Sequence, residues 1–587
     1  MPARHAGQTP PSRLTRRLHA SALALALTIT AASFAQQPAS LVLRNARVYT
    51  MEKGQPWASG VAITGNRITA VFETNAAAAA HIGPNTKVAD LGGKFVVPGF
   101  VDGHTHMATA GGFLIDANLL SVSGDAGLQN ELRRVSAILE PGEWITGGMW
   151  GAYEQWAMGS AAASAPGKTR WRPSRAGIDR LTANHPVLLR SFDGALVLAN
   201  AVALKLAGIE SATGLFERGD AAIDRLNAAV KPKSEARRMR ELREALKRLR
   251  ESGITEVHDI VQDDQVRRYA ALEKSGELTV RVWLRADLSR AAEFEQKGLR
   301  LGAHPFTNQA DARLRWGAFK GYIDGIMGNH SALFFDSYND QPGNYGFYRH
   351  HTSDDPHPPY KNANMEKIYN FLRIARRAGF PANVHAIGDK GVALMLDTYE
   401  RLMKELGRPL DGYRVIHCQV VRPRDFPRFR QLGVYAEVNP YHLSDDMRWM
   451  EERIGRDRSR GAYAFRSLLD HGATLVFASD WGGSFAADYQ VHPKYLLHAA
   501  VNRTTVKQQP AGGWFPEQKI SMEQSLQAYT INGARAAFEG ETRGSIKPGK
   551  LADLAVLDRN LLEIDPRQIL NAQVTMTIVD GRIVFSK

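Results

Sequence analysis

The 587-residue sequence contains a single cysteine, Cys418, so no disulfide can form within the chain, even in an oxidising compartment. Cys418 directly follows His417 at the end of an apolar segment, where a cysteine is more often a small buried residue than a nucleophile. The sequence also lacks an uninterrupted run of 18 or more apolar residues, the length that a membrane-spanning helix requires. These absences argue against a disulfide-stabilised scaffold and against a cysteine-based catalyst.

Acidic residues are also fewer than basic ones, 60 against 74, which gives a formal net charge of +14. Much of the excess falls in one predicted helix, residues 234–251, whose apolar stripe is Met239, Leu242, Ala245, Leu246 and Leu249. No nucleic-acid-binding motif accompanies these charges. We therefore expect a solvated basic helix face and no nucleic-acid partner.

The first 35 residues have the pattern of a secretory signal peptide. Arg13, Arg16 and Arg17 precede an apolar stretch at 20–32, and Ser33-Phe34-Ala35 resembles a signal-peptidase site. We predict a cleaved signal peptide at 1–35, a periplasmic or secreted protein, and no stable membrane anchor after cleavage. The general secretory route and the twin-arginine route both stay open.

Both ends of the mature chain alternate between apolar and polar residues, as strands do. Residues 40–49 and 60–71 carry this pattern, with a Gly65-Asn66 turn, and residues 552–557 and 574–585 repeat it. Because a few strands alone rarely bury enough surface to be stable, we expect the two ends to meet. The prediction is one small β-sandwich domain assembled from residues 40–97 and 541–587.

Between these ends, eight strand patterns alternate with helical patterns, which predicts an α/β fold, a (β/α)8 TIM barrel, over residues 98–540. The opening strand precedes His104, and the other seven are predicted at 255–260, 279–285, 316–323, 381–386, 413–417, 434–438 and 474–479. A large insert at 107–253 separates the first two strands. Inserts at the C-terminal ends of barrel strands commonly shape a substrate pocket.

The C-terminal ends of five predicted strands carry four histidines, one lysine and one aspartate. His104 and His106 follow the first strand, and because alternate residues of an extended segment face the same way, both can reach one cation. The other four residues are Lys320, His385, His417 and Asp480. All strand ends of a barrel converge on one face, so these six side chains should form one site.

These residues lie within longer motifs. The motifs are Pro98-Gly99-Phe100-Val101-Asp102-Gly103-His104-Thr105-His106, Lys320 with Asp324-Gly325, His385-Ala-Ile-Gly-Asp389, His417, Ser479-Asp480-Trp481 and the tail 544–556. In this order, over nearly all of the mature chain, they resemble the amidohydrolase superfamily. The resemblance is to amidohydrolase family 3, in the branch of the N-substituted formamide deformylases.

The resemblance implies a binuclear centre of two divalent metal ions, expected to be zinc. His104 and His106 would bind the more buried ion, His385 and His417 the other, and Lys320, N6-carboxylated by CO2, would bridge them. Asp480 would be both a ligand and the catalytic proton shuttle, with His258 and Asp324 as alternative proton carriers. The implied enzyme is an exported hydrolase of a non-peptide C–N bond, amide or N-acyl/N-formyl, that uses a metal-activated hydroxide.

Several alternatives stay open at this point. The same centre could hydrolyse a lactone or a phosphoester, and the fold could also serve a non-catalytic binding protein. Trp150 and Trp481 are candidates for contacting the substrate or, equally, ordinary core residues. Ile416 and Ala195 stand where relatives usually have an acidic residue and a histidine, so hydrolysis is implied more firmly than a formamide substrate. The expected partners are a small-molecule substrate and, as an open alternative, a second copy of the chain in a homodimer.

Overall fold

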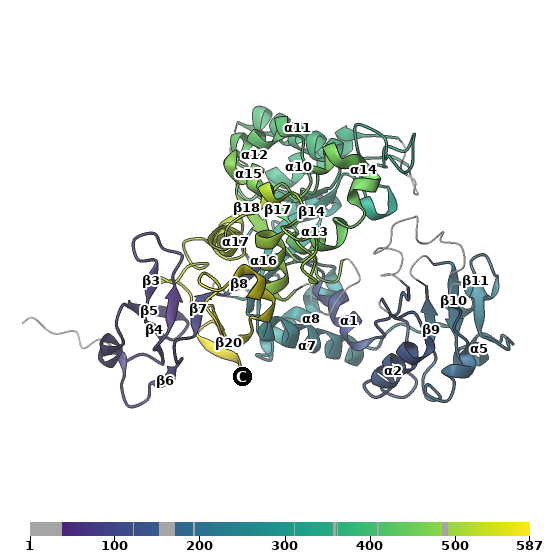
Figure 1. The fold of residues 1–587 in the computed structure, drawn as a ribbon, viewed down its shortest axis with the longest axis horizontal. Helices are drawn as coiled ribbons and strands as arrows, with labels where there is room; N and C mark the ends of the chain where they lie inside the picture. Colours follow the sequence, from purple (N-terminus) through teal and green to yellow (C-terminus); the bar gives the residue numbers. More distant parts are fainter. Residues whose placement is uncertain are drawn as a thin grey trace, which may run out of the picture. The chain divides into compact units, whose positions relative to one another are not determined.

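The computed structural model describes residues 38–120, 122–151, 171–191, 194–309, 312–355, 360, 362–407, 410–483 and 491–587 (Figure 1). The predicted signal peptide at 1–35 lies outside the described residues. Among the described residues, no helix combines the length and the apolar character needed to cross a membrane.

Eight parallel strands form the central sheet, and each pairs with the next along the chain. In sequence they are β8 (Phe100–Thr105), β12 (Ile254–Ile260), β13 (Arg281–Asp287), β14 (Leu314–Tyr322), β15 (Ala382–Ala386), β16 (Arg414–His417), β17 (Tyr435–Val438) and β18 (Leu475–Phe477). All eight coincide with predicted strands to within a few residues. Their side chains are almost all buried, as expected for strands covered on both faces.

The sheet closes on itself between its first and last strands. Thr105 at the end of β8 forms a parallel bridge with Trp481, which follows β18. The amide of His106 donates to the carbonyl of Trp481 at 2.8 Å, and the amide of Asp480 donates to the carbonyl of His104 at 2.9 Å. The predicted (β/α)8 barrel is therefore confirmed.

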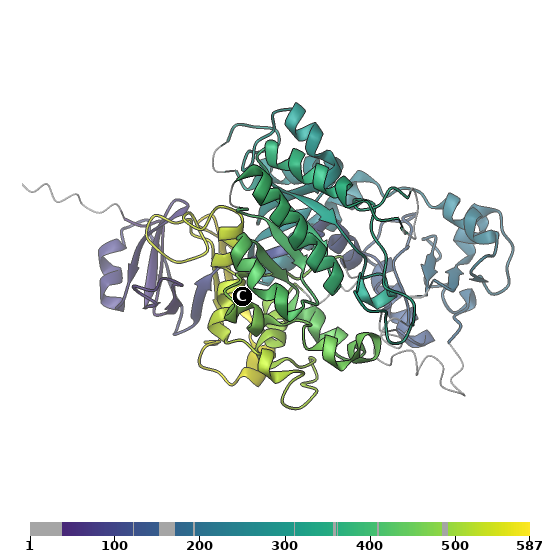
Figure 2. The same ribbon diagram turned by 90° about the horizontal axis from the view of Figure 1, so that it is seen from above.

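Helices cover the outside of the barrel (Figure 2). The helices that follow β12 are α8 (Asp263–Lys274), α9 (Ala291–Gln296), α10 (Met365–Arg377), α11 (Asp389–Leu406), α12 (Phe426–Leu432), α13 (Pro440–Asp446), α14 (Met450–Ser459), α15 (Phe465–Asp470), α16 (Pro493–Asn502), α17 (Met522–Ala528) and α18 (Ile531–Ala536). The large apolar core lies between these helices and the strands.

Two further sheets contain the terminal strands, and the second of them combines strands from both ends of the chain. The first contains β1 (Leu41–Arg44), β4 (Gly60–Thr64), β5 (Arg67–Phe72) and β6 (Lys87–Asp90); the second contains β2 (Arg47–Tyr49), β3 (Trp57–Ala58), β7 (Phe95–Pro98), β19 (Leu554–Leu557), β20 (Val574–Val579) and β21 (Arg582–Ser586). Antiparallel pairing of β7 with β19 joins the two ends, and Leu43, Val61 and Val556 share one buried cluster. The predicted β-domain built from both ends is thus present.

Gly99 separates β7 of this domain from β8 of the barrel. A Cβ atom at this position would lie 2.2 Å from the side chain of Thr255 on β12. Only glycine allows the chain to pass this close to its neighbour. The residue therefore lets one continuous stretch of sequence serve two sheets.

The insert has its own small sheet and apolar clusters. Its elements are α1 (Met107–Ile115), α2 (Asp125–Ser136), β9 (Leu188–Arg190), β10 (Leu196–Ala199), α5 (Ala201–Ala207), β11 (Leu215–Glu217), α6 (Ala222–Ala229) and α7 (Glu235–Glu251). The polar face of α7 is not wholly solvated, in contrast to our expectation. Arg237 is buried because it pairs with Asp116 at 2.9 Å and Glu241 at 3.1 Å and donates to the carbonyl of Trp144 at 2.6 Å.

A buried ion pair joins the barrel to the β-domain and provides a test of their contact. Arg281 on β13 donates to Asp553 at 2.7 Å, and both side chains are at most 5 % exposed. We expect Asp553→Ala to lower the free energy of unfolding by about 3–5 kcal/mol, because it leaves a buried guanidinium short of a partner. Chemical denaturation followed by tryptophan fluorescence measures this change.

The matched control is Glu217→Ala, which removes the exposed ion pair between Glu217 and Arg172. Its effect should stay below about 1 kcal/mol, as for most surface pairs. Equal effects of the two substitutions would contradict the proposed role of the buried pair.

Candidate active site

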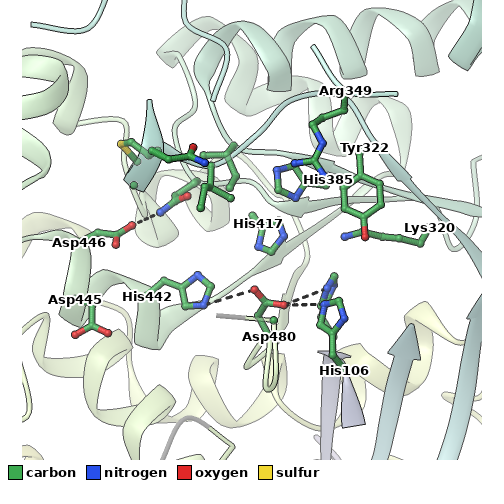
Figure 3. A pocket seen from close by; sticks show the side chains of 18 of the residues that line it. His106, Lys320, Tyr322, Arg349, His385, His417, His442, Asp445, Asp446 and Asp480 are labelled. Carbon is green, nitrogen blue, oxygen red and sulfur yellow. Dashed lines mark hydrogen bonds and ion pairs between the residues drawn. The ribbon is translucent and has the colours of Figure 1, made fainter. Parts of the chain in front are cut away.

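A cavity of about 600 Å³ lies at the C-terminal ends of the barrel strands (Figure 3). All six predicted metal ligands line it: His104, His106, Lys320, His385, His417 and Asp480. Other lining residues are Met149 from the insert, Tyr322 at the end of β14, Arg349 in the segment that follows, and His442, Asp445, Asp446 and Trp449 after β17. The structure therefore brings the predicted residues together at one site.

Asp480 occupies the centre of the histidine cluster. Its Oδ1 lies 3.4 Å from Nε2 of His104 and 3.3 Å from Nε2 of His106. Its Oδ2 lies 3.9 Å from Nε2 of His442. Two groups of three residues share Asp480, and within each group the ligand atoms lie within 4.8 Å of one another. The first group is His104, His106 and Asp480, and the second is His417, His442 and Asp480. Figure 3 shows His106 and His442 directed at the carboxylate from opposite sides.

His385 and Lys320 complete the other side of the cavity. The ring of His385 lies 4.5 Å from that of His417, and the Lys320 amine lies 4.7 Å above the ring of Tyr322. Among the described residues, the Lys320 amine has no hydrogen-bond or ion-pair partner, although its side chain is 1 % exposed. Burial lowers the pKa of Lys320 to about 7, against the attraction of Asp480 and Glu437. Near neutral pH much of this lysine is therefore an uncharged amine.

A buried carboxylate, that of Glu437, orients the ring of His104. Nδ1 of His104 lies 3.0 Å from Oε1 of Glu437 on β17, and Glu437 also accepts from Arg285 at 2.6 Å and from Arg414 at 2.9 Å. An ionised carboxylate only accepts, so the His104 proton is on Nδ1. The lone pair of Nε2 therefore faces the cavity, in the orientation that metal-binding histidines adopt over a carboxylate.

Hydrogen bonds fix the other two buried histidines in the same way. The Asn439 amide donates through Nδ2 to the carbonyl of Ala478 at 3.0 Å, which leaves its Oδ1 to accept from Nδ1 of His417 at 2.8 Å. Nε2 of His385 donates to the carbonyl of Gly325 at 2.9 Å. Each ring thus keeps one nitrogen lone pair unprotonated: Nε2 in His417 and Nδ1 in His385.

Electrostatics favour neutral imidazoles next to an ionised Asp480. Burial lowers the pKa of His104 and His385 well below the usual value and that of His417 to about 3. Burial alone would raise the pKa of Asp480, but hydrogen bonding to the His106 side chain acts in the opposite direction, and the pKa lies well below its usual range. Neutral imidazole and ionised carboxylate are the protonation states in which these groups bind metal ions.

Three buried aspartates support the backbone next to the ligands. Asp102 accepts from the amides of His104 at 3.2 Å and Ser479 at 2.9 Å. Asp259 accepts from the Thr105 hydroxyl and the Met107 amide, both at 2.7 Å. These contacts lie on either side of His106 and next to Asp480, so they fix the backbone from which the ligands project.

The third aspartate, Asp324, does the same for His385. It accepts from the amides of Gly388 and Leu333, both at 2.9 Å. It is fully buried, and burial raises its pKa to about 7. His258, the other alternative proton carrier, is buried between Glu256 at 2.9 Å and Arg414 at 2.8 Å. Neither Asp324 nor His258 lines the cavity.

The two tryptophans proposed as substrate contacts lie elsewhere. Trp150 packs in the apolar cluster of the insert, with its ring 6.2 Å from that of Trp171. Trp481 is fully buried in the barrel core. Neither is among the residues that line the cavity, whereas Met149, next to Trp150, is. The structure thus places both tryptophans in the core, which was the alternative interpretation.

Sequence reasoning missed the contribution of the seventh strand, because it assigned no functional residue to the end of that strand, near Asn439-Pro440. Glu437 and Asn439 each hold a candidate ligand, and His442 on α13 faces Asp480. Glu437 lies in a short apolar strand, where a lone acidic residue is itself a signal of a buried partner. His442 offered no comparable signal, because only the fold shows that α13 turns toward the cavity.

The donor set fits divalent metal ions. The ligands are imidazole nitrogens and a carboxylate, which are the groups that zinc favours, and each buried histidine already directs a lone pair away from its supporting hydrogen bond. A closed (β/α)8 barrel that carries this site at its C-terminal face defines the class: a metal-dependent hydrolase of the amidohydrolase superfamily.

Comparison with known proteins identifies the family. Residues 87–585 match the model described as the amidohydrolase family, and the chain belongs to this family, in the branch known as amidohydrolase family 3. It is 31 % identical to "Protein LONG AFTER FAR-RED 3" of Arabidopsis thaliana, over 93 % of this chain and 92 % of that protein. It is 26 % identical to the N-substituted formamide deformylase of Arthrobacter pascens, over 94 % of this chain and 99 % of that enzyme.

The fold is also found in a solved structure, an uncharacterized metal-dependent hydrolase from Pyrococcus horikoshii. That chain superimposes with a TM-score of 0.68 at 23 % identity, and the match covers 90 % of this chain and 99 % of that one. The resemblance stated from the motifs is confirmed at the level of family and fold.

The contact between Glu437 and His104 can be tested through metal binding. We expect Glu437→Gln to weaken metal affinity about 10- to 100-fold, because an amide does not orient the imidazole or balance the two arginines as a carboxylate does. Competition with a chromophoric chelator measures this affinity without reference to activity. Glu405→Gln, at an exposed position on α11, is the control. Unchanged affinity in Glu437→Gln would show that His104 needs no carboxylate support.

Proposed function

We propose that this protein is an exported amidohydrolase that cleaves a non-peptide C–N bond, an amide or N-acyl/N-formyl bond, in a small molecule. The observation that carries the proposal is the convergence of four histidines, Lys320 and Asp480 on one cavity. The formamide deformylase named among the relatives supports the choice of bond. The signal-peptide pattern at 1–35 supports export to the periplasm or beyond.

We assign His104 and His106 to one divalent ion and His385 and His417 to a second, with zinc as the expected metal. Lys320, carboxylated on Nζ by CO2, would bridge them, because two carbamate oxygens can serve two ions where an amine cannot. The buried Lys320 amine without a described partner supports this assignment. When bound, such ions lower the pKa of water and polarise the carbonyl of the substrate.

The chain's own residues would then move the proton. Asp480 is the one carboxylate of the described cavity in contact with both His104 and His106, so it is placed to take the proton of the attacking water. It would give this proton to the nitrogen of the leaving amine as the C–N bond breaks. His442, 3.9 Å from Oδ2 of Asp480, would orient the carboxylate or the substrate.

Met149, Ile326, Met327 and Trp449 give the outer cavity an apolar wall, which suits a substrate with an apolar substituent. Asp445 and Asp446 in the same wall are not free carboxylates. Asp445 pairs with Arg448 at 2.6 Å, and Asp446 accepts from the Tyr463 hydroxyl at 2.5 Å. These contacts leave Asp480 as the carboxylate available for proton transfer.

Asp480→Asn tests the proposed reaction. On a panel of amides, esters, lactones and phosphoesters we expect the wild type to prefer amides, and a chelator to abolish the activity. The substitution should lower kcat by roughly two to four orders of magnitude, the usual contribution of a general acid/base group. KM should change far less, because the side chain keeps its shape. Near-normal turnover by the variant, or a preference for phosphoesters, would contradict the proposal.

Lys320→Ala tests the bridging carbamate. The variant should lose most of its bound metal and activity, and short carboxylic acids should restore part of both by replacing the bridge. Isotope-labelled bicarbonate should give a carbamate signal in the NMR spectrum of the wild type and none in the variant. Lys404→Ala, at a position 70 % exposed on α11, is the control. Normal metal content in Lys320→Ala would rule out the binuclear arrangement.

A further inference from the structure

A second group of metal-ligating side chains lies outside the cavity. Asp287 ends β13, the third barrel strand, and His350 and His351 lie in the segment that follows β14. One ligand atom from each residue lies within 4.8 Å of the other two. Nε2 of His351 is 3.1 Å from Oδ1 of Asp287, and Nε2 of His350 is 3.9 Å from Oδ2. None of the three residues lines the cavity.

We infer that Asp287, His350 and His351 form an additional site for a divalent transition-metal ion such as Zn²⁺, separate from the proposed catalytic centre. Two imidazoles and one carboxylate are a common protein ligand set for zinc, with water completing the shell. In a tetrahedral site with ligands about 2.0–2.1 Å from zinc, ligand atoms lie about 3.3 Å apart. The carboxylate of Asp287 approaches both rings, His351 through Oδ1 at 3.1 Å and His350 through Oδ2 at 3.9 Å.

The surroundings hold these ligands in place. Asp287 accepts from the amide of Ser289 at 2.9 Å and from its hydroxyl at 2.5 Å, which fixes the carboxylate. His351 is 1 % exposed and packs 5.8 Å from the ring of Phe371. Such supporting contacts are what orient metal ligands in proteins.

An ion could reach this group from solvent. The side chains of His350 and Asp287 are 44 % and 42 % exposed, so both ligands have an open side. The nearby Lys367 ammonium does not bond to these ligands; it donates to the carbonyl of Ser353 at 2.7 Å. We therefore expect a site that exchanges its ion more readily than the buried centre does.

A simple hydrogen bond between Asp287 and His351 is the alternative explanation. It accounts for the 3.1 Å contact, but it gives His350 no reason to approach the same carboxylate with its ring 3.9 Å from that of His351. A shared ion accounts for both contacts.

The site would also act on the cavity. Tyr322 lies 6.0 Å from the ring of His351, nearly parallel to it, and 5.5 Å from the ring of His385. Arg349, next to His350 in sequence, lies over Tyr322 and lines the cavity. An ion bound by His350 and His351 would tie the segment that carries Arg349 to the end of β13. Occupancy of this site would thus limit the positions open to Arg349.

Metal counting on the full-length protein tests the inference. Proteins are loaded with Zn²⁺, passed through a desalting column at a fixed free zinc concentration and analysed by mass spectrometry of the metal. We expect the wild type to hold one equivalent more than His350→Ala and Asp287→Asn. Titration of the partly loaded proteins with Zn²⁺ should show one class of exchangeable site in the wild type. The zinc affinity of this site should be at least tenfold weaker in both variants.

His471→Ala, which removes an exposed histidine of another region, is the matched control and should keep the extra equivalent. We expect His350→Ala to fold normally, because this exposed side chain contributes little packing. A thermal melt of the variant checks its folding. Equal zinc content and affinity in the wild type and His350→Ala would overturn the inference. The result does not depend on the proposed reaction, whose own test uses Asp480 and Lys320.

Discussion

The contact between the first barrel strand and the chain after the last one is the constraint on which the site depends. It is made by the backbone: the amide of Asp480 donates to His104 and the amide of His106 donates to Trp481. Asp102 reinforces it by accepting from Ser479. Paired parallel strands have their C-terminal ends side by side. Asp480, after the last barrel strand, therefore lies next to His104 and His106, which follow the first. The contact that closes the barrel therefore also places Asp480 beside His104 and His106.

Beneath the histidines, a chain of buried charged and hydrogen-bonded side chains crosses the barrel interior. Glu437 lies between Arg285 and Arg414, Arg414 donates to His258, and His258 donates to Glu256. A single buried ion costs several kcal/mol unless it is paired, so each member depends on the next. Glu256 in turn pairs with Arg543 at 2.5 Å, near the start of the C-terminal strands. The support of His104 thus extends from the cavity to the β-domain.

The sequence predicted what depends on local pattern. Strand alternation and the residues at strand ends are local, so the eight strands and the residues at His104, Lys320 and Asp480 could be located without coordinates. Contacts across the barrel are not local, and Glu437 and His442 were missed for this reason. The insert shows the limit most clearly: an aromatic residue, Trp150, was a candidate for the pocket and equally for the core, yet its neighbour Met149 lines the cavity. Which of two adjacent side chains faces the cavity depends on how the insert packs.

The supporting contacts also explain how a site of uncharged imidazoles persists in a buried place. Asp102, Asp259 and Asp324 bond to backbone amides and hydroxyls, so their hydrogen bonds do not use the nitrogen atoms that face the cavity. Glu437 bonds to Nδ1 of His104, and Asn439 bonds to Nδ1 of His417. Among the residues that the structure describes, the lone pairs toward the cavity are therefore left without a protein donor, which costs stability in the absence of an ion. This cost accompanies preorganisation, because the fold orients the ligands before a cation binds.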